Sequence, residues 1–170
     1  MRKVMIFILL LCLALTISVY AKPKPVNKLL GVKLGDTAAQ VKKVLGKPAD
    51  EGSTFGGSIS KGEYGIDYER PGADRYGIVI DLNDGKVVII SVIDPSYKAN
   101  VQGVKVGTDA KTVRKIFGEP DVKKTNEYTN PYISNTPIVQ WKYYKYNLGF
   151  DIADGKVDSI YVYDYSVTGR

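Results

Sequence analysis

The chain has 170 residues, a formal net charge of +6, 44% hydrophobic residues, 25% charged residues, one cysteine and no histidine. This composition is close to the globular average, which excludes an intrinsically disordered or collagen-like chain. Because Cys12 lies in a segment that we expect to be removed, the mature chain has neither imidazole nor thiolate. It therefore lacks the usual zinc and copper ligands and any Ser-His or Cys-His pair, and we predict no metal and no cofactor.

The first 21 residues are typical of a secretory signal peptide. Arg2 and Lys3 form its positive start, an apolar run extends to Val19, and we place cleavage after Ala21. An uncleaved membrane anchor is the alternative, but the run is shorter than the roughly 20 residues that a spanning helix needs. A lipoprotein would need a small residue before Cys12, where a leucine stands. We therefore expect a secreted, periplasmic or cell-envelope protein.

Residues 22–27 form a basic, proline-containing leader. Without Arg2 and Lys3 the chain has 22 basic and 18 acidic residues, a net charge of +4. Lysines 22, 24 and 28 beside two prolines indicate an extended segment, either a solvated tether or one attracted to an anionic polymer or lipid surface. The other charges are mixed along the chain, without the arginine cluster typical of nucleic-acid binding, so we expect no nucleic-acid partner.

Most of the remaining sequence consists of an internal repeat. Residues 31–48 return as residues 103–120 with nine of 18 positions identical, and residues 76–94 match residues 146–164 with nine of 19 identical. The two blocks keep nearly the same shift, 72 and 70 positions. We interpret the chain as a tandem duplication, with one copy at residues 28–97 and the other at residues 101–165.

The first block of each copy predicts a short helix. A polar cap at residues 36–37, or 108–109, precedes an apolar stripe, and a glycine followed by a proline ends it. The stripes consist of Val41, Val44 and Leu45, and of Val113, Ile116 and Phe117.

The second block predicts a β-hairpin. Alternating apolar residues lead to Asp84-Gly85 in one copy and Asp154-Gly155 in the other, and Asp-Gly is a strong signal for a tight reversal. The returning strands are expected at residues 87–93 and 157–165. A further strand precedes each hairpin, at 63–70 and 138–144, and a fourth is expected at 54–60 and 122–128. We predict an α+β fold in which two helix-plus-strand units share one antiparallel sheet of about eight strands, with both helices on one face.

The repeated pattern G-x-x-x-G-[DT]-[TD]-x-x-x-V-x-x-[VI]-[LF]-G-x-P, then an aromatic strand and D-G-K-V, resembles the β-lactamase inhibitory protein-like fold. It is also similar to the small outer-membrane assembly lipoproteins of the SmpA/OmlA type, which carry one copy. The resemblance covers nearly all of residues 28–165. It implies a non-enzymatic protein that binds other proteins, in the inhibitor through the concave face of the sheet. This chain lacks the inhibitor's disulfides, and we make no prediction of β-lactamase inhibition.

Tyrosines distinguish the second copy from the first. Ile160 and Val162 should lie under the helix, so Tyr161, Tyr163 and Tyr165 should point to the opposite face, where the first copy has Ser91, Ile93 and Pro95. Tyrosine gives large, stiff contact area and is frequent in binding hot spots, although it also suits strands for structural reasons. Trp141 is expected in the core. The predicted protein-binding residues are Lys142, Tyr144, Tyr161, Tyr163, Tyr165 and, in the irregular loop at residues 126–137, Tyr132.

The sequence leaves three functions open. We favour an exported, non-catalytic binding protein whose partner is another protein. The first alternative is an envelope structural or assembly factor that forms a permanent complex and uses the basic leader. The second is a hydrolase built on carboxylates such as Asp67, Glu69, Asp81 and Asp151. We expect Asp81 and Asp151 to be exposed at matching strand positions, which favours a structural role over catalysis.

Overall fold

The computed structural model describes residues 22–52, 63–69, 76–126 and 137–168. The predicted signal peptide, Tyr132, the expected strand at 54–60 and most of the loop at 126–137 lie outside these residues. Within the described ranges, no helix has the length and apolar character needed to cross a membrane.

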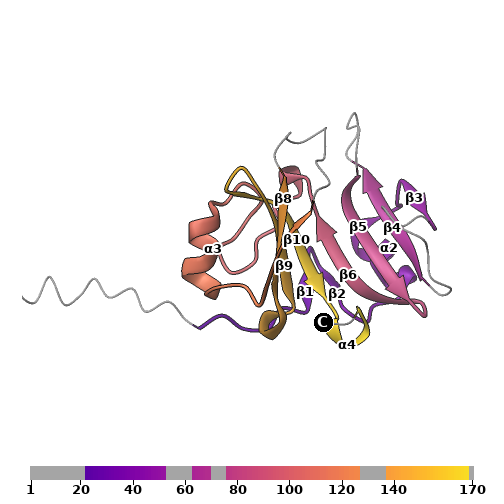
Figure 1. Cartoon of the computed structure of the whole chain (residues 1–170). Helices are drawn as coiled ribbons and strands as arrows, with labels where there is room; N and C mark the ends of the chain where they lie inside the picture. Colours follow the sequence, from indigo (N-terminus) through magenta and orange to yellow (C-terminus); the bar gives the residue numbers. More distant parts are fainter. Residues whose placement is uncertain (1–21, 53–62, 70–75, 127–136, 169–170) are drawn as a thin grey trace, which may run out of the picture.

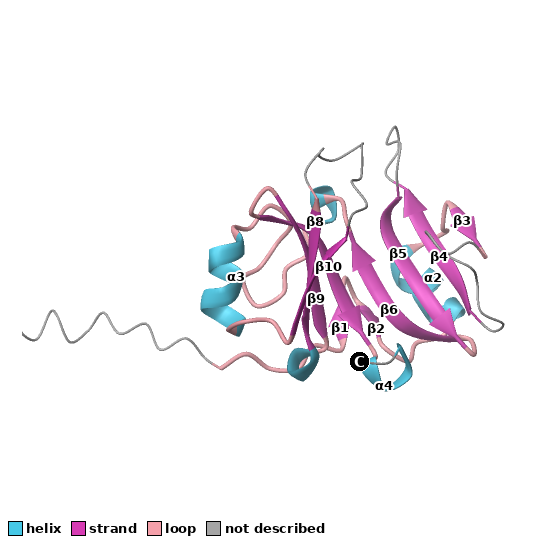
Figure 2. Cartoon of the chain, viewed as in Figure 1, coloured by secondary structure: helices cyan, strands magenta, loops and turns pink. Residues whose placement is uncertain are grey.

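An antiparallel sheet of eight strands forms the centre of the described fold (Figures 1 and 2). Its strands are β3 (Asp50–Glu51), β4 (Glu63–Glu69), β5 (Tyr76–Asn83), β6 (Lys86–Val92), β7 (Val122–Asn126), β8 (Ile138–Tyr143), β9 (Leu148–Ala153) and β10 (Lys156–Tyr163). They lie in the order β3-β4-β5-β6-β10-β9-β8-β7, so β6 and β10 join the two halves in the middle. Strands β1 (Lys28–Leu29) and β2 (Val32–Lys33) form a separate small pair. The chain is therefore α+β with one large antiparallel sheet.

The two main helices begin and end where the sequence predicts. Helix α2 (Ala38–Leu45) is capped by Thr37, whose hydroxyl accepts from the backbone N–H of Gln40, and α3 (Ala110–Phe117) is capped by Asp109. Both helices end at a glycine with positive φ, Gly46 at 87° and Gly118 at 85°. Glycine is favoured there because a side chain would be strained in this backbone region.

The hairpin turns also follow the prediction. Asp84 and Gly85 join β5 to β6 with φ values of 47° and 73°, and Asp154 and Gly155 join β9 to β10 with values of 50° and 72°. Positive φ at both central residues matches a type I′ turn, whose twist suits antiparallel strands and which Asp-Gly favours. Short helical turns complete the described chain: η1 (Pro95–Tyr97), η2 (Tyr144–Tyr146) and α4 (Tyr165–Thr168).

One face of the sheet, the first face, carries the core. Residues paired in register from β4 to β8 form an apolar row across it: Ile66, Ile80, Ile90, Val162, Leu148 and Tyr143. All six are almost completely buried, and they belong to the same hydrophobic cluster as Val41 of α2 and Val113 and Phe117 of α3. Both helices therefore pack on the first face. Trp141 is also in this core, as predicted.

Tyrosine hydroxyls satisfy the ends of both helices. Tyr68 donates to the backbone oxygen of Gly46 (3.2 Å), and Tyr143 donates to that of Gly118 (3.1 Å). The last carbonyls of a helix have no partner within the helix, so each bond stabilises a helix end and ties it to the sheet.

The predicted apolar stripe on α2 is wrong for one residue. Val41 is fully buried, but Val44 is 47% exposed. Its side chain lies over Gly31 in the turn between β1 and β2, where a methyl group added to the glycine would lie 2.8 Å from Cγ1 of Val44. The small hairpin thus takes the place beside Val44 that the sheet was expected to fill.

The basic leader is held to the fold. The side chain of Gln102 bonds both backbone groups of Lys24, at 3.2 and 2.8 Å, and the N–H of Val26 donates to the backbone oxygen of Tyr146 (2.9 Å). A freely solvated tether is therefore the wrong description of this segment. The contacts fix its path before β1 and leave the ammonium group of Lys24 at the exposed surface.

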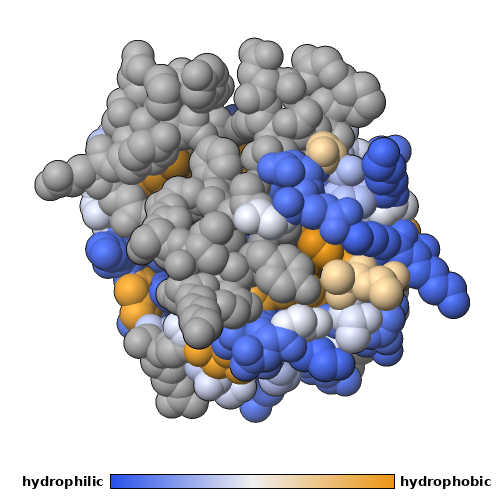
Figure 3. All heavy atoms as spheres, turned by 90° about the vertical axis from the view of Figure 1, so that its right-hand side faces the viewer, coloured by the Kyte–Doolittle hydropathy of each residue, from blue (hydrophilic) through white to orange (hydrophobic). Residues whose placement is uncertain are grey.

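Figure 3 shows the side of the molecule nearest β3 and β4 in Figure 1. Polar and charged residues predominate among its coloured atoms, and the apolar areas between them are small. The edge strand β3 consists of two exposed acidic residues, and such a short, charged edge is protected against pairing with another chain.

Candidate functional site

The face of the sheet opposite the helices, the second face, carries the predicted site residues. Pairing in register places six side-chain positions in one row from β4 to β8: Asp67, Val79, Ser91, Tyr161, Gly149 and Lys142. Directly paired residues in an antiparallel sheet point to the same side, and these alternate with the buried residues of the first face. Polar and aromatic residues thus replace the aliphatic row of the core.

Four of the predicted tyrosines form a continuous row, which we call the tyrosine row. The ring centroids of Tyr161 and Tyr163 are 5.5 Å apart, those of Tyr163 and Tyr165 are 5.0 Å apart, and both pairs are stacked. Tyr144 meets Tyr165 edge to face at 4.8 Å. These distances are within the range in which aromatic pairs attract one another. Strand β10, α4 and η2 together position the four rings.

The tyrosine row is less exposed than the sequence predicts. Tyr163 is 7% exposed and Tyr165 is 8% exposed, whereas Tyr144 and Tyr161 are half-buried. The ring of Tyr163 lies over Gly149, where a methyl group would lie 2.6 Å from its Cε2 atom. Tyr163 and Tyr165 therefore support the row, while Tyr144 and Tyr161 offer surface to a partner.

The sequence predicted a last strand that includes Tyr165, but Tyr165 lies outside it. Strand β10 ends at Tyr163, and Asp164 accepts from the backbone N–H of Ser166 (3.1 Å) as α4 begins. The Tyr165 hydroxyl turns back and donates to the backbone oxygen of Leu148 (3.0 Å). The polar Asp-x-Ser pattern at residues 164–166 is the sequence signal for this change of direction.

Lys142 adds a positive charge to this end of the face. It is half-buried, and its ammonium nitrogen lies 5.8 Å from the centre of the Tyr163 ring. Such a distance allows a cation–π attraction. Of the six predicted binding residues, the structure brings together five, and Tyr132 lies outside the described residues.

Carboxylates also lie on the second face, and their burial differs from the prediction. Asp151 is only 8% exposed, although its alternating position predicts an exposed side chain. Asp67 is fully buried. The hydroxyl of Tyr161 donates to Oδ2 of Asp151 at 2.5 Å. Its other oxygen, Oδ1, is buried without a partner at hydrogen-bond geometry among the described residues. The aromatic side chain of the neighbouring strand covers a position that alternation alone assigned to solvent.

The environment of this pair raises the pKa of both groups. Burial raises the pKa of Asp151, and the nearby Asp158 carboxylate adds to the rise, while hydrogen bonds from Tyr161 and Gln140 oppose it. Burial also raises the pKa of Tyr161 well above its usual value, and the negative charge of Asp151 adds to this. Although the ring of Tyr161 is half-buried, its hydroxyl points inward to the carboxylate. Tyr161 therefore remains a hydrogen-bond donor at neutral pH and is no general base.

The raised pKa of Asp151 predicts a pH dependence of stability. The folded protein binds this proton more tightly than the unfolded chain does, so the contribution of Asp151 is fully present below its unfolded pKa and is lost as the pH rises through its folded pKa. Asp151→Asn removes this loss. The difference in unfolding free energy, variant minus wild type, should therefore grow with pH across this window and then stay constant, as measured by urea denaturation at several pH values.

Asp84→Asn is the matched control for this measurement. Asp84 is exposed in the turn between β5 and β6, and asparagine accepts the same positive φ. Its difference from wild type should not follow the pH profile of Asp151→Asn. Parallel profiles for the two variants would contradict the assignment to a buried carboxyl group.

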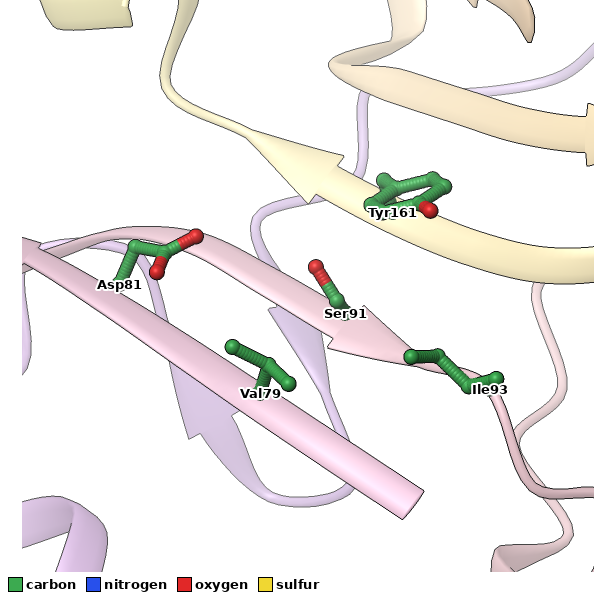
Figure 4. Close-up of a pocket in the computed structure, with 5 residues that line it drawn as sticks. All are labelled: Val79, Asp81, Ser91, Ile93 and Tyr161. Atoms are coloured by element: carbon green, nitrogen blue, oxygen red, sulfur yellow. The ribbon is translucent and has the colours of Figure 1, made fainter. Parts of the chain in front are cut away.

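A pocket of about 150 Å³ opens beside the tyrosine row (Figure 4). It lies between β5, β6 and β10 and is lined by Val79, Asp81, Ser91, Ile93 and Tyr161. Tyr161 was predicted from the sequence as a binding residue, whereas the other four lining positions were not predicted to form a site. Their outward alternation along β5 and β6 was the available signal, but it does not show that the surface is hollowed. Among the described residues, no group of three acidic, histidine or cysteine residues could hold a metal ion.

Comparisons with known proteins give no family for this chain. No family model matches the sequence, and no curated protein is significantly similar to it. Among solved structures, an extracellular protein with an SCP domain from Bacillus anthracis matches 79% of this chain at 10% identity, with a TM-score of 0.49. A cysteine-rich secretory protein from Staphylococcus aureus matches 86% at 10% identity, also with 0.49.

The chain spans about half the length of these two proteins, 45% and 48%. A DUF4309 family protein from Bacillus subtilis is covered more completely: the match spans 85% of this chain and 88% of that protein, at 16% identity and a TM-score of 0.48. A likeness of this degree does not indicate an activity.

Proposed function

We propose that this chain is an exported, non-catalytic binding protein that recognises another protein through the second face of its sheet. The observation that carries the proposal is the tyrosine row: four rings, brought from β10, α4 and η2, contact one another in sequence beside Lys142. The rings of Tyr163 and Tyr165 are buried and fix the positions of the other two. Tyr144 and Tyr161 then contact the partner as rigid anchors.

Rigidity is the physical advantage of this arrangement. A tyrosine that is already held by stacking loses little conformational entropy when a partner binds. The partly buried hydrogen bond from Tyr161 to Asp151 fixes one ring further. Lys142 supplies charge at the same end of the sheet and favours an acidic group of the partner there.

The test is capture by the immobilised protein from secreted and envelope fractions, followed by affinity measurement with each purified partner. Because Tyr163 and Tyr165 are buried, the informative variants are Tyr144→Ala and Lys142→Glu. Loss of a hot-spot residue weakens binding by about 2 kcal/mol or more, which is about thirtyfold. We expect each variant to lose the partner in capture and to weaken its affinity to about this degree.

Lys123→Glu provides the matched control. Lys123 pairs with Trp141, so its side chain leaves β7 on the side of the first face, opposite Lys142, and it is exposed. The control should keep the affinity of the wild type. Equal capture by all variants would refute binding through the second face, and capture that is lost in Lys123→Glu alone would place the interface on the other side.

We also infer that the two halves are copies of one ancestral unit and that the fold is of the β-lactamase inhibitory protein-like kind. Support comes from the repeated sequence blocks, the mirrored strand order about the β6–β10 pair, and the matching bonds from Tyr68 and Tyr143 to the last glycine of each helix. Export rests on the first 21 residues of the sequence.

A further inference from the structure

We propose that the pocket between β5, β6 and β10 receives an arginine side chain of the protein partner. The inference deepens the proposed function, because it states the chemistry that the second face recognises beside the tyrosine row. It rests on the size of the pocket, the nature of its walls and the charge of the surrounding face.

The size of the pocket restricts its occupant. At about 150 Å³ it is smaller than the roughly 300–1,000 Å³ typical of sites for metabolites and drug-sized ligands. It is open to the surface of a sheet and lies within one strand of the tyrosine row. A single side chain reaching down from a bound protein matches both the volume and the position.

The walls combine apolar surface with one charge. Val79 and Ile93 offer aliphatic groups, Tyr161 offers the flat ring, and Figure 4 shows the carboxylate of Asp81 and the hydroxyl of Ser91 on the pocket side of the strands. A guanidinium group suits these surroundings because it is planar and weakly hydrated. It stacks on an aromatic ring and donates in pairs to a carboxylate. An ammonium group is more strongly hydrated and lacks the planar shape.

The charge of the face favours a cation. Asp67, Asp81 and Asp151 all project from its strands, and the pKa of Tyr163 is raised by burial and then by the negative charges of Asp151 and Asp81. Among the described residues in the row from β4 to β8, Lys142 is the one basic side chain, and it lies over Tyr163 rather than in the pocket. Asp81 is the one charged residue among the five that line the pocket, so the charge at this point of the second face favours a cation.

The test uses small probes and requires no partner. N-acetyl-L-arginine methylamide is titrated into the ¹⁵N-labelled protein, and the backbone amide shifts are followed by NMR. The citrulline derivative serves as the uncharged probe of nearly the same shape. We expect saturable shifts at Val79, Asp81, Ser91, Ile93 and Tyr161 with arginine, and binding at least about tenfold weaker with citrulline, because hydrogen bonds between charged groups are the stronger kind.

Asp81→Asn should weaken arginine binding at least about tenfold, whereas Asp84→Asn, three residues further along in the exposed turn, should leave it unchanged. The same spectra show whether each variant is folded. If Asp81→Asn does not fold, added salt provides the second measurement on the unchanged protein, because it should weaken arginine binding and leave citrulline unaffected. Equal shifts with both probes, or arginine shifts outside the pocket, would overturn the inference.

The two proposals fail separately. Loss of partner capture in Tyr144→Ala together with an absence of arginine binding would refute the pocket chemistry and keep the proposed function. If the arginine probe binds in the pocket but the capture experiment finds no protein partner, the guanidinium group does not come from a protein. That outcome would also refute the proposed function.

Discussion

Replacing Phe117 with alanine should lower the free energy of unfolding by about 3–5 kcal/mol, as expected for deletion of a large buried ring. Phe117 is the last residue of α3, and its ring centroid lies 5.4–5.8 Å from those of Tyr143, Tyr146 and Phe150. Alanine would leave a cavity at the junction of α3 and the sheet and remove three aromatic contacts. Urea denaturation followed by circular dichroism measures the loss.

Two further variants test whether the cavity causes the loss of stability. Phe117→Leu keeps most of the volume and should cost less than about 1.5 kcal/mol. Leu45, which aligns with Phe117 in the repeated sequence, is only half-buried, so Leu45→Ala should cost less than Phe117→Ala. A loss below about 1 kcal/mol for Phe117→Ala would mean that α3 is not anchored by this aromatic cluster.

Local features of the fold could be predicted from the sequence because the residues that determine them are close together in the chain. The cap at Thr37, the glycine ends of α2 and α3, and the Asp-Gly turns each depend on a few neighbouring residues and on backbone preferences. The faces of the strands also follow from alternation. These signals were sufficient to predict a large antiparallel sheet with two capped helices.

Burial on the second face could not be predicted in the same way. Alternation states the side to which a residue points, but the exposure of Asp151 and Tyr163 depends on which side chains meet across β9 and β10, where the register shifts between Val157 and Ser159. The hydrogen bond from Tyr161 to Asp151 and the packing of the Tyr163 ring over Gly149 can be predicted only when that pairing is known. The position of Val44 over the β1–β2 turn is also a contact between separate elements.

The candidate site was partly predictable for the same reason. Tyrosines at every second position of one strand indicate an aromatic stripe without knowledge of the fold, and Tyr161 and Tyr163 are such a pair. The pocket, by contrast, takes residues from three strands, two of which are far from Tyr161 in the sequence. Within it the small side chain of Ser91 stands between the larger Val79 and Tyr161, with which Ser91 pairs in register.

Gly149→Ala should destabilise the protein by about 1–3 kcal/mol, the usual cost of overpacking a close-packed site. The added methyl group would lie 2.6 Å from Cε2 of Tyr163 and 3.4 Å from the backbone oxygen of Trp141. The Tyr163 ring is held between those of Tyr161 and Tyr165, so it cannot move without disturbing the whole tyrosine row. Thermal and urea denaturation measure the effect on stability.

A double-mutant cycle identifies the contact responsible. In the background of Tyr163→Ala the ring is absent, and Gly149→Ala should then cost only a few tenths of a kcal/mol beyond the background, so the two changes couple by about 1–3 kcal/mol. Additive effects would instead assign the strain to the backbone oxygen of Trp141. If the ring is the cause, Gly149→Ala should also weaken partner binding, although Gly149 itself has no side chain to contact a partner, because the row that positions Tyr144 and Tyr161 rests on this glycine.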